Sequence, residues 1–389
     1  AQLGPELEQI SHYIFTHAEL GLQEYQSAAF LERYMEQQGF SVEKGVCGLE
    51  TAFLARWGSR GPCIALLAEY DALAGYGPEN KDPGHACGHN WIAATTAGAA
   101  VTLARYCAAE GLEAQILLVG SPAEETFSSK ALLANAGVFD EVDCAMQAHL
   151  GAFHTVYPWS LALGTRQLIY TGKAAHASSQ PWEGINALDA VRLFFNGVDA
   201  MRQQLKPDVR VHGIIQEGGQ AANSIPERAS CLFYARTGRK DELQAVLERL
   251  ENVARGAALM TGATLEIRQP ELPMDDLVPV PSLQALAAEL LKQEGLESLT
   301  PEQAQAQFRG STDVGNVSYA CPTQFIEMDP CCGKVFRAHT QEALELADAP
   351  AYPMLHKAVR ILAGIGAEII QNSALRETCH REFAAAVKA

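Results

Sequence analysis

The sequence predicts an α/β fold with a mainly parallel sheet flanked by helices, interrupted by a smaller α+β unit. Three observations lead to this prediction. Strand-like and helix-like segments alternate in the first part of the chain, which is typical of βαβ units. Two of the strand-like segments are apolar at nearly every position, as expected for strands that helices cover on both faces. The order of strand-like and helix-like segments changes near residue 161, and the earlier alternation resumes near residue 271.

Composition excludes several classes of protein. Of 389 residues, 48% are hydrophobic and 19% are charged, which favours a well-cored globular protein over a disordered one. The net charge of −17 argues against binding to nucleic acid or to an anionic membrane. No apolar run reaches the roughly 18 residues of a membrane-spanning helix. The ten cysteines lack a repeating spacing, so we expect buried free thiols in a reducing compartment, the cytoplasm.

The first 150 or so residues are expected to alternate between the two kinds of element. Apolar residues recur at helical spacing at Leu3, Leu7, Ile10 and Ile14. The helices are expected at 3–14, 27–38 and 91–110, and the strands at 51–57, 63–68, 114–120 and 142–148.

The middle of the chain has a different order of elements. Strands are expected at 167–172, 209–217, 229–236 and 264–269, and helices at 185–205 and 242–260. This β-α-β-β-α-β order matches a split βαβ, ferredoxin-like unit. Afterwards a helix at 282–293, a strand at 323–328 and a helix at 353–371 resume the first pattern. We therefore expect one domain from 1–160 and 271–389, and an inserted domain at 161–270.

One short run, His85-Ala86-Cys87-Gly88-His89-Asn90, concentrates metal-ligand chemistry. Cys87 and His89 are two residues apart, so both can turn toward the same side of a glycine-hinged loop. Thiolate and imidazole bind zinc and similar metals. A structural zinc finger would need a second closely spaced pair, and none follows. Further ligands must come from elsewhere in the chain.

Polar residues of ligand type follow three successive strands. Asp71 comes shortly after the second strand, Glu124-Glu125 after the third, and His149 after the fourth. In open α/β sheets, sites lie beyond the carboxyl ends of the strands, so we expect these side chains to converge. One glutamate would bind metal while its neighbour faces a water molecule. Asp71 could orient a ligand or simply cap a turn, and both interpretations stay open.

The remaining candidate site residues are weaker evidence for a site when each is considered alone. His149 is preferred to His154 because His154 lies further into the following loop. His339 lies in the C-terminal segment, and His176 follows the first strand of the insert. The segment 310–313 resembles a tight turn and lacks the lysine of a phosphate-binding loop.

Together, these residues resemble the dinuclear metallopeptidase family of aminoacylases, carboxypeptidase G, carnosinase-type dipeptidases and N-acyl-amino-acid amidohydrolases. The likeness is greatest to the branch with p-aminobenzoyl-glutamate hydrolase and β-alanyl-lysine-type dipeptidases. The matching stretches follow the family's order along nearly the whole chain: 68–73, 84–90, 123–125, 149, 172–177, 223–227 and 310–318.

The resemblance implies a catalytic domain built from both chain ends and an inserted dimerisation or lid domain, giving a homodimer. It implies two divalent metal ions per chain, with zinc the first choice and manganese the alternative. The implied ligands are Cys87, which would bridge the two ions, and His89, Glu125, His149 and His339.

Roles in the reaction also follow from the resemblance. Glu124 would be the general base and later the acid for the leaving amine. His176 would reach the partner subunit's site and steady the oxyanion. Asn223 and Arg236 would hold the free carboxylate of the substrate, an N-acyl amino acid or dipeptide; an Arg offers the two-pronged geometry that a carboxylate needs.

Three features depart from the family pattern. The loop 75–83 is longer than expected, with Ala74 where a proline is usual. The segment 334–338 before His339 is atypical. Glu69 stands where many relatives place a metal-binding histidine, and Cys87 would compensate for it.

The sequence thus predicts a metal-dependent amidohydrolase. Two alternatives are kept. The first is a metal-free cysteine hydrolase with Cys87 as nucleophile and His85 or His89 as base, which leaves Glu124-Glu125 without a role. The second is a binding module that retains the fold without catalysis. Loss of activity in a chelator and its recovery with added metal would exclude the first alternative. A metal content near zero per chain would favour the second.

Overall fold

The computed structural model describes residues 3–77, 81–307 and 310–388. The chain divides into two compact units, Ala1–Trp159 with Leu277–Arg309 and Asp313–Ala389, and Ser160–Asp276 with Gly310–Thr312. The second boundary lies six residues later than expected from the sequence. Residues up to 276 stay with the second unit because Met274 exchanges two backbone hydrogen bonds with Leu163, of 2.9 and 3.0 Å.

The first unit is built on a six-stranded sheet of order β1-β2-β4-β3-β5-β10. Its strands are β1 (Ser41–Lys44), β2 (Phe53–Trp57), β3 (Cys63–Ala68), β4 (Gln115–Gly120), β5 (Cys144–Leu150) and β10 (Thr323–Met328). The strands β4, β3, β5 and β10 are mutually parallel, and β2 pairs antiparallel with β1 and β4. The predicted mainly parallel sheet is confirmed.

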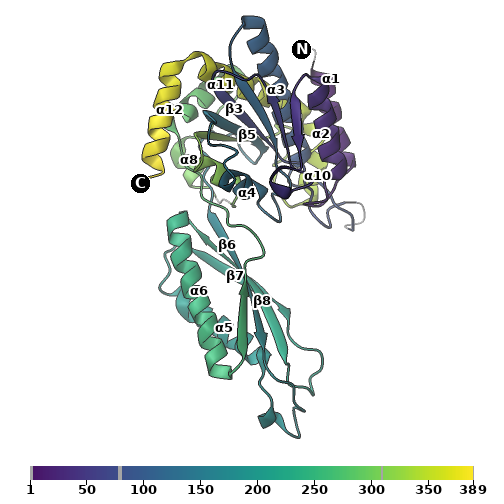
Figure 1. The fold of residues 1–389 in the computed structure, drawn as a ribbon, viewed down its shortest axis with the longest axis vertical. Helices are drawn as coiled ribbons and strands as arrows, with labels where there is room; N and C mark the ends of the chain where they lie inside the picture. The colour runs from purple at the N-terminus through teal and green to yellow at the C-terminus, as the bar shows by residue number, and fades with distance from the viewer. Residues whose placement is uncertain (1–2, 78–80, 308–309, 389) are drawn as a thin grey trace. The chain divides into compact units, whose positions relative to one another are not determined.

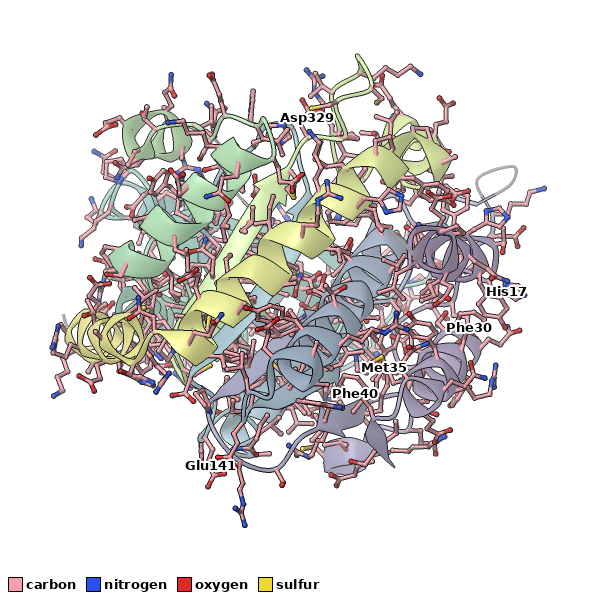
Figure 2. All side chains as sticks on the ribbon, turned by 90° about the horizontal axis from the view of Figure 1, so that it is seen from above. His17, Phe30, Met35, Phe40, Glu141 and Asp329 are labelled. Carbon is pink, nitrogen blue, oxygen red and sulfur yellow. The ribbon has the colours of Figure 1, made fainter. Side chains whose placement is uncertain are left out.

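Helices cover both faces of this sheet (Figure 1). They are α1 (Gly4–Thr16), α2 (Tyr25–Gln37), α3 (His89–Glu110), α4 (Ser129–Asn135), α7 (Pro281–Gln293), α8 (Pro301–Gln305), α9 (Val314–Ser318), α10 (Gln341–Leu346), α11 (Tyr352–Gln371) and α12 (Ser373–Ala386). Figure 2 shows α3 and α11 side by side across one face, with Met35 and Phe40 beside them in the region of α2.

The central strand β3 explains why its sequence is apolar throughout. Ile64, Leu66 and Ala68 pack into the core with α1, α3 and α11, while Ala65 and Leu67 pack into the core with α4 and α9. Successive side chains of a strand point to opposite faces, so a strand between two helical layers needs apolar residues at every position.

The second unit is a four-stranded antiparallel sheet of order β7-β8-β6-β9 with two helices (Figure 1). Its elements are β6 (Ala162–Thr171), α5 (Ala187–Arg202), β7 (Arg210–Glu217), β8 (Arg228–Thr237), α6 (Lys240–Thr261) and β9 (Thr264–Arg268). Alternate β8 residues, among them Cys231 and Phe233, join the core with α5 and α6. The strand order is that of the predicted ferredoxin-like unit.

Two differences from the expected elements affect the site. The helix α3 begins at His89, so His89 lies on a helical first turn. The strand β5 continues to Leu150 because β10 pairs with it as far as Met328, so His149 lies within the strand, opposite Glu327.

Part of the long 75–83 loop, residues 78–80, falls outside the described residues. Among the helices that the structure describes, none has the length and apolarity to cross a membrane.

Candidate metal centre

Four segments of the first unit bring the sequence-predicted ligands together. Three overlapping groups each offer ligand atoms within 4.8 Å of one another. The groups are Cys87 with His89 and His149, Cys87 with Glu125 and His339, and His89 with Glu124 and Glu125. Cys87 belongs to two of the three groups, which is the arrangement expected of a ligand shared between two ions.

Gly88 starts the helix that carries His89. It has φ +81°, and a Cβ there would lie 3.0 Å from the Leu150 side chain, so glycine is needed at this turn. The Nδ1 atom of His89 lies 2.8 Å from Asp71 Oδ1. Because the carboxylate accepts the Nδ1 proton, Nε2 presents its lone pair to the centre.

His149 is oriented in the same way by the backbone. Its Nδ1 atom lies 2.6 Å from the Leu150 carbonyl oxygen, to which it donates. Its Nε2 atom therefore carries the lone pair and lies 3.6 Å from Cys87 Sγ.

The two adjacent glutamates lie on a tight turn after β4. Ala123 has φ +56°, a backbone conformation that costs free energy for a non-glycine residue. The buried Glu24 carboxylate stabilises this turn by accepting a 2.8 Å hydrogen bond from the Ala123 N–H. The Glu125 N–H donates to Asp71 Oδ2 at 3.0 Å. Asp71 thus contacts both a histidine and the turn, which favours the orienting role over simple capping.

His339 reaches the centre from the segment before α10. Its backbone N–H donates to the Ala86 carbonyl at 2.9 Å, and Tyr76 donates its hydroxyl proton to the His339 carbonyl at 2.7 Å. The Nε2 atom lies 3.3 Å from Glu125 Oε1, and 53% of the side chain is exposed. His339 is therefore at the solvent side of the centre.

The charges at the centre perturb one another. Burial and the neighbouring carboxylates of Glu69, Glu125 and Asp313 raise the pKa of Glu124 well above its usual range. Burial lowers the pKa of His89, but the charges and hydrogen bonds of Asp71 and Cys87 together outweigh burial and raise the pKa above its usual range. Such perturbed groups concentrate at functional sites.

The donor chemistry fits divalent metal ions. The five sequence-predicted ligands offer a thiol, three imidazoles and a carboxylate, which suits zinc-like ions. His89 Nε2 and Glu125 Oε1 are buried, lie 3.8 Å apart, and have no hydrogen-bond partner within the described part of the chain. Buried polar atoms left without partners are costly, and a shared cation would satisfy both.

A buried ion-pair group behind the centre was not foreseen from the sequence. Lys130 is fully buried, and its ammonium donates to Glu69 Oε1 at 2.5 Å and to Asp313 Oδ1 at 2.7 Å. The only sequence signal is a charged residue at the start of the apolar segment 131–134. Glu24 was also missed, because nothing nearby in sequence marks it.

The remaining predicted site residues lie in the second unit. His176 follows β6 and forms an isolated bridge with Ser224, beside Asn223, whose carbonyl accepts from the Ala177 N–H at 3.0 Å. Arg236 lies at the other end of β8 and donates to Ser311 Oγ at 2.7 Å. Arg228 and Arg236 are eight residue steps apart along the strand, a distance of about 26 Å. A single chain therefore does not bring Asn223 and Arg236 together.

Comparison with known proteins defines the class. The family described as "Peptidase dimerisation domain" matches residues 163–259, which lie within the second unit. The chain is 34% identical to the mouse (Mus musculus) Xaa-Arg dipeptidase over 389 residues, covering 96% of this chain and 88% of the dipeptidase. It is 35% identical over 271 residues to one of the polypeptides of the p-aminobenzoyl-glutamate hydrolase of Escherichia coli K12, covering 67% of this chain and 56% of that polypeptide.

Solved structures share the fold. An aminobenzoyl-glutamate utilization protein from Klebsiella pneumoniae gives a TM-score of 0.74 at 21% identity, covering 95% of this chain and 98% of that one. A dinuclear metal-binding peptidase of the M20 family from Bacillus subtilis gives 0.64 at 22% identity, covering 93% and 99%.

The fold and these matches define a peptidase with an inserted dimerisation domain. The chain belongs to the M20 family of peptidases. It is accordingly a hydrolase of C–N amide bonds, and the two alternatives, a metal-free cysteine hydrolase and a non-catalytic binding module, are not favoured.

Proposed function

We propose that this chain hydrolyses the amide bond between an acyl or aminoacyl group and an amino acid with a free carboxylate, at a centre of two divalent metal ions. The observation that carries the proposal is the overlap of the ligand groups, in which Cys87 is shared between a set with His89 and His149 and a set with Glu125 and His339. A thiolate that would be a ligand of both ions accounts for this pattern.

Cys87, His89, His149, Glu125 and His339 would hold the ions, with zinc the first choice and manganese the alternative. When bound, such ions lower the pKa of a water molecule and polarise the carbonyl of the scissile amide.

The chain's own residues supply the proton transfers. Glu124 takes the proton of the attacking water and later gives it to the leaving amine. Its buried position beside other carboxylates supports this role, because a carboxylate with a raised pKa is better matched to proton transfer near neutral pH. Asp71 keeps the His89 Nδ1 proton in place and fixes the turn through the Glu125 N–H.

The substrate carboxylate and the oxyanion would be bound by residues of the second unit. Arg236 offers a guanidinium held by Ser311. His176 and Asn223 lie at the opposite end of β8. We infer that His176 and Asn223 complete the site of a partner subunit. Arg236 of the same chain would bind substrate at the other site of the dimer. This arrangement requires a homodimer.

The structure also argues against the cysteine-hydrolase alternative. His85 donates to the Ile14 carbonyl at 3.1 Å, so its ring is engaged away from Cys87. Burial raises the pKa of the Cys87 thiol, whereas a nucleophilic cysteine needs a lowered one. The alternative also leaves Glu124 and Glu125 without a role.

The free state of all ten cysteines supports a cytoplasmic location, which we also propose.

The experiment that tests the function is a hydrolysis screen with zinc- or manganese-reconstituted protein. The substrates are N-acetyl amino acids, dipeptides with a C-terminal arginine, p-aminobenzoyl-glutamate and the carboxyl-amidated form of each. We expect turnover of at least one class and loss of turnover on amidation. Turnover that is unaffected by amidation would remove the free-carboxylate requirement, and no hydrolysis of any amide would refute the proposal.

A further inference from the structure

Lys130 is a charged residue that the proposed reaction does not use. It lies in the first turn of α4 and is fully buried. Its ammonium donates to Glu69 and Asp313, and its backbone N–H donates to Asp313 Oδ2 at 2.9 Å. A buried ammonium is retained only where carboxylates compensate its charge, and here two of them bind it directly.

The carboxylates around Lys130 form a group of hard-metal donors. Glu69, Glu124 and Asp313 are all buried, and each offers an oxygen within 4.8 Å of the other two. Three convergent carboxylate oxygens are the donor set that magnesium, calcium and manganese ions prefer. In this chain, a lysine ammonium provides the positive charge for that group.

Glu69 also lies at the edge of the proposed zinc-type centre. Its Oε2 atom is 3.5 Å from His89 Nε2. Two ligand atoms bound about 2.1 Å from one tetrahedral ion are separated by about 3.4 Å. Glu69 is therefore at ligand spacing from His89, while its other oxygen, Oε1, is bound by Lys130.

We propose that Lys130 is a positioning residue whose ammonium takes the place of a hard divalent cation among Glu69, Asp313 and Glu124, and so keeps Glu69 out of the metal-ligand set. The centre then retains the sulfur and nitrogen donors of Cys87 and the histidines. Lys130 in this way restricts both how many ions the chain binds and which kind.

The test uses Lys130→Met, which removes the charge with little change in side-chain length, and Lys130→Arg, which retains the charge. Each full-length protein is stripped with a chelator and dialysed against excess Mn²⁺, and bound metal per chain is measured by mass spectrometry. We expect Lys130→Met to bind about one more Mn²⁺ per chain than the wild type, because the three carboxylates become available. Lys130→Arg should match the wild type.

A double variant separates the carboxylate group from a general loosening of the structure. Lys130→Met combined with Glu69→Gln lacks one of the three carboxylates, so the additional Mn²⁺ should be lost. Thermal unfolding gives a second readout, since added Mg²⁺ should raise the melting temperature of Lys130→Met but not that of the wild type.

Three results would overturn the proposal: a wild-type Mn²⁺ count in Lys130→Met, an additional ion in Lys130→Arg, or retention of the additional ion in the double variant. If Lys130→Met does not fold, bound metal is measured instead in Lys130→Gln and judged by the same criteria. This variant keeps a hydrogen-bond donor without the charge. Neither readout requires catalysis. Failure of the hydrolysis screen would therefore refute the proposed function and leave this result standing.

Discussion

Replacing the two adjacent glutamates one at a time should separate catalysis from metal binding. Replacement of Glu124 should impair catalysis, and replacement of Glu125 should impair metal binding. Glu124→Gln removes the proton acceptor but leaves the ligands Cys87, His89 and Glu125 unchanged. General acid–base groups typically contribute about 10²–10⁴ in rate, equivalent to about 3–5 kcal/mol of transition-state stabilisation. We place Glu124→Gln in this range because the carboxylate is buried, at 8% exposure, where bulk water replaces a lost proton acceptor poorly.

Glu125→Gln is the matched variant. The Oε1 atom of Glu125 lies 3.3 Å from His339 Nε2 and 3.8 Å from His89 Nε2. Replacing this carboxylate by an amide therefore weakens a metal ligand that belongs to two of the ligand groups. The assay combines steady-state kinetics with a metal count on both proteins. Glu124→Gln should lose kcat with nearly unchanged KM and metal content, whereas Glu125→Gln should lose metal. Full activity of Glu124→Gln, or loss of metal from it, would refute the assignment of the two roles.

Three further predictions test the metal dependence, the dimer and the support of the turn. Dialysis against a chelator should abolish hydrolysis and added Zn²⁺ or Mn²⁺ should restore it; activity in the stripped protein would exclude the metal mechanism. Mixing inactive Glu124→Gln and His176→Ala chains should restore about a quarter of wild-type activity, since about half of random dimers are mixed and each has one intact site; no recovery in verified heterodimers would rule out sharing across subunits. Burial, with a smaller contribution from Asp71, raises the pKa of Glu24 from 4.5 to about 7. The folded state then binds this proton more tightly, so the Glu24 contribution to stability falls by about 3 kcal/mol as pH rises from 4.5 to about 7. Glu24→Gln should flatten this part of the unfolding profile, and an unchanged pH dependence would contradict the assignment.

The fold was largely predictable because its main strands are short, apolar and bounded by polar residues. The bounds of β3 and β10 are those expected from the sequence. The short helices α4, α8, α9 and α10 were not predicted, because a helix of five to seven residues carries too few turns for a periodic pattern. The strand β1, of four residues, was not predicted either. The C-terminal helix α12 was missed as well, and its single buried residue, Cys379, explains why no apolar stripe marks it.

The candidate site was predictable where residue type and strand position coincide. Cys87 and His89 lie two residues apart in a distinctive run, Glu125 follows a buried strand, and His149 lies near the carboxyl end of another. His339 was found through the resemblance alone. Lys130 could not be found, because its significance depends on Glu69 and Asp313, which are 61 and 183 residues away in sequence. Such a contact is a property of the tertiary structure and leaves no local pattern.

The pairing of β5 with β10 has a consequence for synthesis of the chain. These neighbouring strands are separated in sequence by the whole stretch Ser160–Asp276. During translation, the edge of β5 therefore stays exposed until the ribosome has released residues 323–328, while the intervening unit is already able to fold. An uncovered parallel strand edge is a template for association with other chains. Truncated products that end before β10 should consequently aggregate, and chaperones that bind nascent chains should engage this protein over that interval.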